Sequence, residues 1–156
     1  MTAIRGLLVG LAAGAAGTTA LNASTYVDMV VRARPSSSTP EDMVEKLSEL
    51  TGAKIPGQGD ERSNRLAGLG PLTGLITGLG IGAAWGLAQS QGVRPPAAVA
   101  TLAITFAAMI GSDGPMAAFG LSDPRSWHRS DWLADAIPHL FYGLVTATVA
   151  QALDPR

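Results

Sequence analysis

Apolar residues fall into four long runs that polar segments separate. The runs cover about residues 4–31, 66–87, 95–111 and 131–153, and residues 36–64 form the only long hydrophilic connector. An α-helix needs roughly 20 predominantly apolar residues to cross the hydrocarbon core of a bilayer. We therefore predict an all-α integral membrane protein with four transmembrane helices, all within a single membrane domain over residues 1–156.

The hydrophilic connector carries the pattern of a short amphipathic helix over residues 40–50. Pro40 follows Ser38 and Thr39, which suits a capped helix start, and Gly52 suits its end. Spacing by three and four places Met43, Val44, Leu47 and Leu50 on one face. The opposite face is acidic, whereas an anchor lying on a membrane surface normally carries lysine and arginine there. We expect a lid over the end of the bundle or an element that contacts another protein.

Glycines recur at every fourth position in two of the apolar runs. Residues four apart share one face of a helix, and a glycine face allows a second helix to approach closely in lipid. We predict helix packing through these two ladders, either with each other or with a copy in another subunit. Their members are Gly6, Gly10 and Gly14 in the first run, and Gly70, Gly74, Gly78, Gly82 and Gly86 in the second.

The third and fourth apolar runs are bounded by turn residues and aromatics. The short connection 89–96 predicts that the second and third helices form an antiparallel hairpin. The segment Gly111–Pro115 predicts an interruption of the third helix, with Asp113 as its polar stop. Tryptophan and tyrosine concentrate at membrane surfaces, so we expect interfacial positions for Trp127, Trp132 and Tyr142 at one surface and for Trp85 at the other.

Composition and charge support a membrane protein and exclude several functions. Hydrophobic residues make up 47% of the chain and charged residues 15%, and the mean hydropathy is +0.25. A net charge of −1 without a basic cluster argues against nucleic acid as a partner. The chain has no cysteine, which excludes disulfides, thiolate catalysis and cysteine-ligated metals.

Basic residues predict how the chain is oriented in the membrane. Eight of them fall in the two connectors that follow the first and third runs, and only Arg5, Arg94 and Arg156 fall on the other side. Cytoplasmic loops carry the excess of lysine and arginine. We expect both termini to face away from the cytoplasm and the acidic helix to face it.

The candidate chemistry lies mainly in the fourth run, where Asp131, Asp135 and His139 are spaced four apart. Ionisable side chains inside a membrane are costly and face the bundle interior. Antiparallel packing places Asp113 and Asp28 at the same end, which predicts a polar vestibule lined by Asp113, Asp135, His139 and Asp28. Three readings of the Asp135 and His139 pair remain open: a structural hydrogen bond between helices, a proton or solute pathway, and a metal site with Asp131 as a weak third ligand.

Several short motifs resemble the YagU-like group of small bacterial inner-membrane proteins. They are the glycine- and alanine-rich first run followed by Arg34-Pro35, Pro40-Glu-Asp-Met43, Gly114-Pro-Met116 through Gly120-Leu121, and Asp135 four residues before His139. The resemblance implies a multispanning protein of the bacterial plasma membrane. It supplies no activity, cofactor or substrate.

Two functions follow from these features. The first is a structural or accessory subunit of a membrane assembly, with the lipid bilayer and other membrane-protein chains or further copies of the chain as partners. The alternative is a small transporter or proton-coupled channel that uses the Asp/His vestibule. Because the sequence offers no complete catalytic constellation, we favour a non-enzymatic role without a cofactor.

Overall fold

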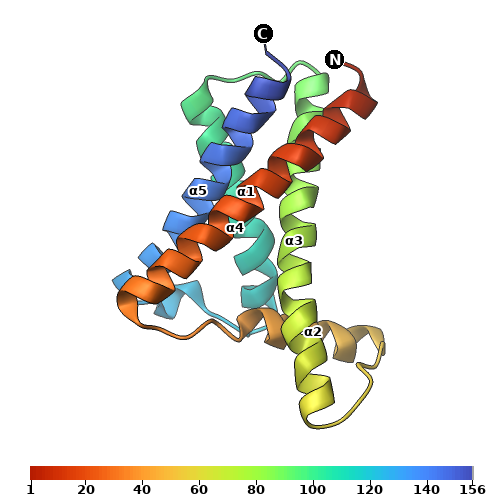
Figure 1. Cartoon of the computed structure of the whole chain (residues 1–156), viewed down its shortest axis with the longest axis vertical. Coiled ribbons are helices and arrows are strands. Elements are labelled where there is room, and N and C mark those ends of the chain that lie inside the picture. The colour runs from red at the N-terminus through yellow and green to blue at the C-terminus, as the bar shows by residue number, and fades with distance from the viewer. Residues whose placement is uncertain (156) are drawn as a thin grey trace.

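The protein is all-helical over residues 1–155, the part of the chain that the computed structural model describes, and this part contains no β-strand. Its α-helices are α1 (Ala3–Arg32), α2 (Thr39–Thr51), α3 (Asp60–Ser90), α4 (Ala97–Ala118) and α5 (Arg129–Leu153) (Figure 1). The 3₁₀ turn η1 (Pro124–Ser126) precedes α5. The four long helices α1, α3, α4 and α5 are long and apolar enough to cross a membrane. The chain is therefore a multi-pass membrane protein by the length and composition of its helices.

The helix ends follow from local capping chemistry. The Thr2 hydroxyl accepts a hydrogen bond from the Arg5 amide at the start of α1, and Ala33 ends that helix in the left-handed conformation at φ 50°. Helix α2 ends at Gly52, where φ is 72° and a side chain would be strained. A capping box between His128 and Asp131 opens α5.

Helix α1 is the centre of the bundle. It crosses in front of the others and packs against both α3 and α5, whereas α4 packs mainly against α5 and less against α3 (Figure 1). The most deeply buried large side chains are Ile104 of α4 and Tyr142 and Thr146 of α5, and the latter two lie against Gly17 of α1. Short helix α2 lies across the N-terminal part of α3, whose first turns extend past it (Figure 1).

Small residues bring α1 and α3 into close contact. A β-carbon added to Gly6 would lie 2.5 Å from the carbonyl oxygen of Gly86, and one added to Gly14 would lie 2.6 Å from that of Gly78. Gly10 meets Gly82 in the same way, midway between these two pairs. The two backbones leave no room for side chains along this line.

The predicted interruption of the third helix is wrong, because α4 continues through residues 111–115 to Ala118. Pro115 lacks an amide hydrogen and so removes one helical hydrogen bond, but it lies in the last turns, where the loss is small. Ser112 does not compete with the helix, because its hydroxyl lies 3.0 Å from the Ala108 carbonyl and 3.2 Å from the Met109 carbonyl of the preceding turn. Asp113 therefore lies inside a helix and is not its stop.

The expected interfacial position of Tyr142 is also wrong. Its side chain is 1% exposed in the core, and its hydroxyl donates a hydrogen bond of 2.6 Å to the Gly78 carbonyl of α3. A buried tyrosine needs such a partner for its hydroxyl. Trp127 and Trp132 behave differently, since their rings meet edge to face near the start of α5 with centroids 5.0 Å apart.

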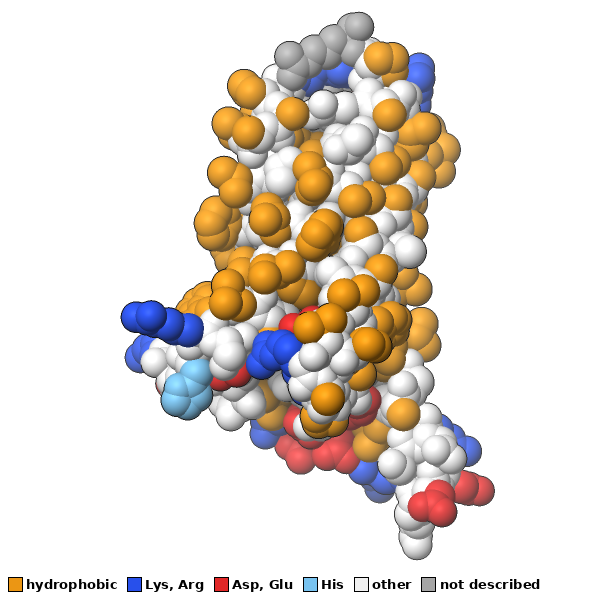
Figure 2. Space-filling view, turned by 60° about the vertical axis from the view of Figure 1, so that its left-hand side comes forward, with side chains coloured by type: hydrophobic (Ala, Val, Ile, Leu, Met, Phe, Trp, Pro, Cys, Tyr) orange, Lys and Arg blue, Asp and Glu red, His pale blue; other side chains and the backbone are white. Residues whose placement is uncertain are grey.

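Charged side chains gather at the two ends of the bundle. Figure 2 shows a broad hydrophobic surface over the long helices and a concentration of acidic and basic side chains at the end that carries α2. At the opposite end, the buried Asp154 carboxylate pairs with Arg94 and lies 3.9 Å from Arg5. This distribution leaves an apolar band between two charged ends.

Candidate functional site

A cluster of polar side chains lies between α4 and α5, near the end of the bundle that carries α2. Ser112 and Asp113 come from the last two turns of α4, and Asp135 and His139 from the first half of α5. His139 is only 9% exposed. The predicted vestibule residues Asp113, Asp135 and His139 are thus brought together, and Ser112 joins them.

His139 is held through both ring nitrogens. Its Nδ1 lies 2.9 Å from the Asp135 backbone carbonyl and 3.2 Å from the Asp135 carboxylate oxygen Oδ1. Both of these groups are acceptors, so we assign the hydrogen of the neutral ring to Nδ1. The second nitrogen, Nε2, lies 3.2 Å from the Ser112 hydroxyl across the helix interface.

The Ser112 hydroxyl satisfies the ring in both of its protonation states. When His139 is neutral, Nε2 is an acceptor and the hydroxyl can donate to it. When His139 is protonated, Nε2 becomes a donor and the hydroxyl can accept, while its own hydrogen turns to the Ala108 carbonyl 3.0 Å away. A change of proton occupancy therefore needs only a rotation of one hydroxyl.

The Asp135 carboxylate is incompletely satisfied. Its Oδ2 atom is buried and has no hydrogen-bond partner within residues 1–155. Asp113 lies close enough to interact electrostatically with both Asp135 and His139. Two carboxyl groups and one imidazole consequently share a region of low solvent access.

Pro138 weakens the helix beside this cluster. It has no amide hydrogen, so the carbonyl of Ala134 loses its usual helical partner one turn earlier. Pro138 itself is buried inside α5. Helix α5 therefore has one backbone hydrogen bond fewer in the turn that precedes His139.

The other predicted site residues lie elsewhere. Asp28 pairs with Arg34 and lies 3.5 Å from Arg32 at the end of α1. Asp131 does not join Asp135 and His139, because its carboxylate accepts a hydrogen bond of 3.0 Å from the His128 amide at the start of α5. Capping explains this difference, since the first amides of a helix need acceptors. In the described chain, no group of three His, Asp or Glu side chains is arranged to hold a metal ion.

The predicted packing glycines divide into two groups. Six of them oppose one another across α1 and α3, as described above, namely Gly6, Gly10, Gly14, Gly78, Gly82 and Gly86. Gly70 instead contacts Pro40 and Glu41 of α2, and a β-carbon on Gly74 would meet nothing within 4 Å in the described residues. The end of the second ladder therefore lies outside the contact with α1.

Sequence reasoning missed three residues that shape the site and its surroundings. Ser112 was missed because the sequence predicts that the third helix is interrupted there, whereas α4 continues through it. Gly17 and Gly143 stand outside the four-residue spacing, yet a β-carbon on Gly17 would lie 2.9 Å from Tyr142, and one on Gly143 would lie 2.6 Å from the Thr101 carbonyl. A search for small residues one turn beyond each ladder would have found Gly17.

Comparison with known proteins assigns neither a family nor a function to the chain. No protein-family model matches the chain, and neither the curated proteins nor the solved structures give a match. The resemblance to the YagU-like group therefore stays a prediction that rests on its motifs.

Proposed function

We propose that the chain is a small proton-coupled transporter or channel in which Asp113, Asp135 and His139 bind and release a proton. The observation that carries this proposal is the double role of Ser112, which can satisfy His139 with or without its second proton. Histidine changes charge near physiological pH, and an ionisable group within a membrane helix is a functional candidate by default.

The surroundings of the pair favour this role over a purely structural hydrogen bond. A structural pair gains most when every polar atom is satisfied, whereas Asp135 Oδ2 is buried without a partner among the described residues. Asp113 adds a second carboxyl group within electrostatic reach. The pair is therefore part of a larger group of ionisable side chains and not an isolated hydrogen bond.

Proton movement across vesicles tests this proposal. The 156-residue chain is reconstituted into vesicles that enclose a pH-sensitive dye, and the decay of an imposed pH difference is recorded. We expect the chain to accelerate the decay, and Asp135→Asn and His139→Gln to return it to the rate of protein-free vesicles. His128→Asn is the matched control, because His128 is exposed at the start of α5 and asparagine can keep the cap there, so the rate should be unchanged.

Two results would contradict proton coupling. One is a decay with the unchanged chain that equals the decay in protein-free vesicles. The other is a His139→Gln variant that conducts as well as the unchanged chain. Each variant is first shown to elute at the same volume and to have the same helical content, so that misfolding does not imitate a loss of conduction.

A structural or accessory subunit is the second candidate function. Its support is the outward face of α4, where Val99, Leu102, Phe106 and Ile110 are all more than half exposed. In this proposal, the glycine ladders pack α1 against α3 within one chain and leave α4 for lipid or another membrane protein. The glycine contact and the α4 face then serve different purposes.

The positions of the basic residues support a particular orientation of the chain in the membrane. We place the chain in the bacterial plasma membrane, with both termini on the non-cytoplasmic side and amphipathic helix α2 on the cytoplasmic side. The excess of lysine and arginine in the two connectors at the α2 end supports this orientation. The proton site would then lie nearer to the cytoplasmic surface.

A further inference from the structure

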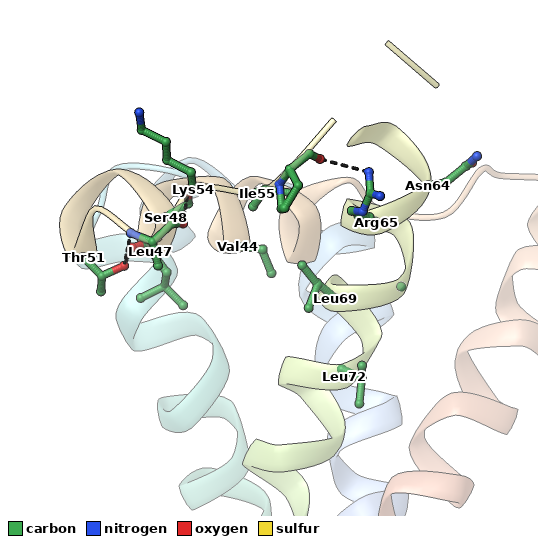
Figure 3. A pocket seen from close by; sticks show the side chains of 13 residues that line it. Val44, Leu47, Ser48, Thr51, Lys54, Ile55, Asn64, Arg65, Leu69 and Leu72 are labelled. Carbon is green, nitrogen blue, oxygen red and sulfur yellow. Dashed lines mark hydrogen bonds between the residues drawn. The ribbon is translucent and has the colours of Figure 1, made fainter. Parts of the chain in front are cut away.

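A groove of about 560 Å³ lies between α2, the loop after it and the start of α3. Figure 3 shows Val44, Leu69 and Leu72 toward the bundle, and Lys54 and Arg65 at the opposite, outer side. Its volume lies in the range of small-molecule sites. It is separate from the Asp135 and His139 cluster, with which it shares no lining residue.

Polar contacts hold α2, the loop after it and α3 together around the groove. Arg62 of α3 pairs with Glu45 of α2. Arg65 Nη1 donates a hydrogen bond of 3.1 Å to the Pro56 carbonyl and so ties the loop to α3 (Figure 3). The Ser48 hydroxyl donates one of 2.8 Å to the Ala53 carbonyl. The groove is therefore formed before any ligand arrives.

The two charged residues that line the groove are both basic. Its lining residues include Lys54 and Arg65 and no aspartate or glutamate. Lys54 makes no ion pair within the described part of the chain. The Glu61 carboxylate lies 3.4 Å from Arg65 Nη1 and offsets part of that charge, but the guanidinium retains further N–H donors. An anionic group fits this rim.

The groove also lies at the depth where a lipid headgroup would be found. Helix α3 has 31 residues, which is about 46 Å at 1.5 Å per residue and longer than the roughly 30 Å core of a bilayer. Its polar first turns, including Arg65, therefore project beyond the apolar core, while Leu69 and Leu72 lie one and two turns deeper. Both leucines are exposed, at 38% and 50%.

We infer that this groove binds one anionic phospholipid of the surrounding bilayer. One of its two acyl chains would lie against Val44, Leu47, Leu69 and Leu72, and its phosphate would be bound by Lys54 and Arg65. Basic side chains at the cytoplasmic face of membrane helices attract anionic lipid headgroups. The inference needs the chain to lie in a membrane but does not depend on the proton site.

Lipid retention measured by native mass spectrometry tests this inference. The chain is stripped of lipid in mild detergent and mixed with phosphatidylglycerol or phosphatidylcholine that carry the same acyl chains. We expect one phosphatidylglycerol to be retained in preference to phosphatidylcholine. Lys54→Gln should weaken its retention about fivefold, the effect of removing one basic side chain from an anionic lipid surface. Lys46→Gln is the charge control, since Lys46 pairs with Glu49 and does not line the groove.

A second pair of variants tests whether the lipid occupies the groove, by filling the groove with a side chain. Gly68 lines the groove and a β-carbon there meets nothing within 4 Å in residues 1–155, so a leucine side chain can start from Gly68 and occupy the groove. Gly80→Leu is the matched control, because Gly80 is equally open but lies outside the groove. We expect only Gly68→Leu to abolish the retention of phosphatidylglycerol.

Three results would overturn the inference. The first is equal retention of the two lipids, which would mean an apolar site without headgroup recognition. The second is an equal loss in Lys54→Gln and Lys46→Gln, or in Gly68→Leu and Gly80→Leu. The third is a dimer that Gly68→Leu abolishes, which would mean that a second copy of the chain occupies the groove.

Discussion

Tyr142 joins three helices through one side chain. Its buried ring lies beside Gly17 of α1 and in one core cluster with Ile104 of α4, and its hydroxyl donates to the Gly78 carbonyl of α3. The same carbonyl lies within the contact between α1 and α3. A single hydroxyl therefore connects the α5 core to the glycine contact.

Removal of this hydroxyl should cost a measurable amount of stability. We expect Tyr142→Phe to lower the free energy of unfolding by roughly 0.6 to 1.5 kcal/mol, the range for one hydrogen bond in a membrane or a soluble protein. Unfolding of the chain from mixed micelles with increasing SDS measures this difference.

The matched control for Tyr142 is the other tyrosine of the chain. Tyr26 is 62% exposed, and its hydroxyl makes no hydrogen bond in the described residues. Tyr26→Phe should leave the unfolding curve unchanged. Equal curves for Tyr142→Phe and the unchanged chain would show that the buried hydroxyl contributes nothing net.

At the scale of elements, the close approach of α1 and α3 depends on particular glycines. A β-carbon on Gly10 would lie 2.9 Å from the Ala83 α-carbon, which is backbone that cannot move aside alone. We expect Gly10→Ala to destabilise the bundle by about 1 to 3 kcal/mol through overpacking. The same SDS unfolding series measures this loss.

Gly74 provides the control for this prediction. Its spacing places it in the same ladder, yet a β-carbon there meets open space within the described structure. Gly74→Ala should therefore be neutral or stabilise the helix by up to about 1 kcal/mol, the gain of alanine over glycine in a helix. Equal destabilisation by both substitutions would show that glycine acts through the helix itself and not through the contact.

The sequence predicted elements better than their contacts. Hydrophobic run lengths located the four long helices, and the caps at Pro40 and Gly52 located α2. The ladder spacing could not separate Gly74 from Gly78, because a crossing helix leaves the contact after a few turns. Tyr142 and Ser112 were missed because burial and helix continuation depend on neighbours that lie far away in the sequence.

Polar residues were predicted with similarly mixed results. The four-residue spacing joined Asp135 to His139, and the antiparallel arrangement brought Asp113 beside them. The same spacing failed for Asp131, because the capping requirement of the helix start determines its contact. Asp28 instead pairs with Arg34 and lies near Arg32, because these two opposite charges belong to the same end of α1 as Asp28 itself.

At the scale of the whole molecule, the outer face of α4 distinguishes the two proposed functions. Its central apolar side chains Phe106 and Ile110 are 59% and 70% exposed. Lipid covers such a face without specificity, whereas a partner subunit buries it. If the chain is an accessory subunit, a larger assembly should be purified in mild detergent, and Phe106→Ala with Ile110→Ala should release the chain from it.

Mass measurement after native purification checks this expectation. Ile76→Ala is the control, because Ile76 belongs to α3 and is a comparably exposed apolar side chain, at 65%. A lone monomer from the unchanged chain would count against the subunit function and leave the proton-coupled function as the remaining proposal. An assembly that the α4 substitutions leave intact would place the partner on another face.

The two ends of the described chain meet at one end of the bundle, where Arg5 of α1 lies beside the last residues of α5 (Figure 1). Four crossings return the chain to the side on which it began. A tandem duplication of such a unit would therefore insert its second half in the same direction as the first. The resulting protein would have parallel repeats, related by an axis along the membrane normal, and not the inverted repeats that arise from units with an odd number of crossings.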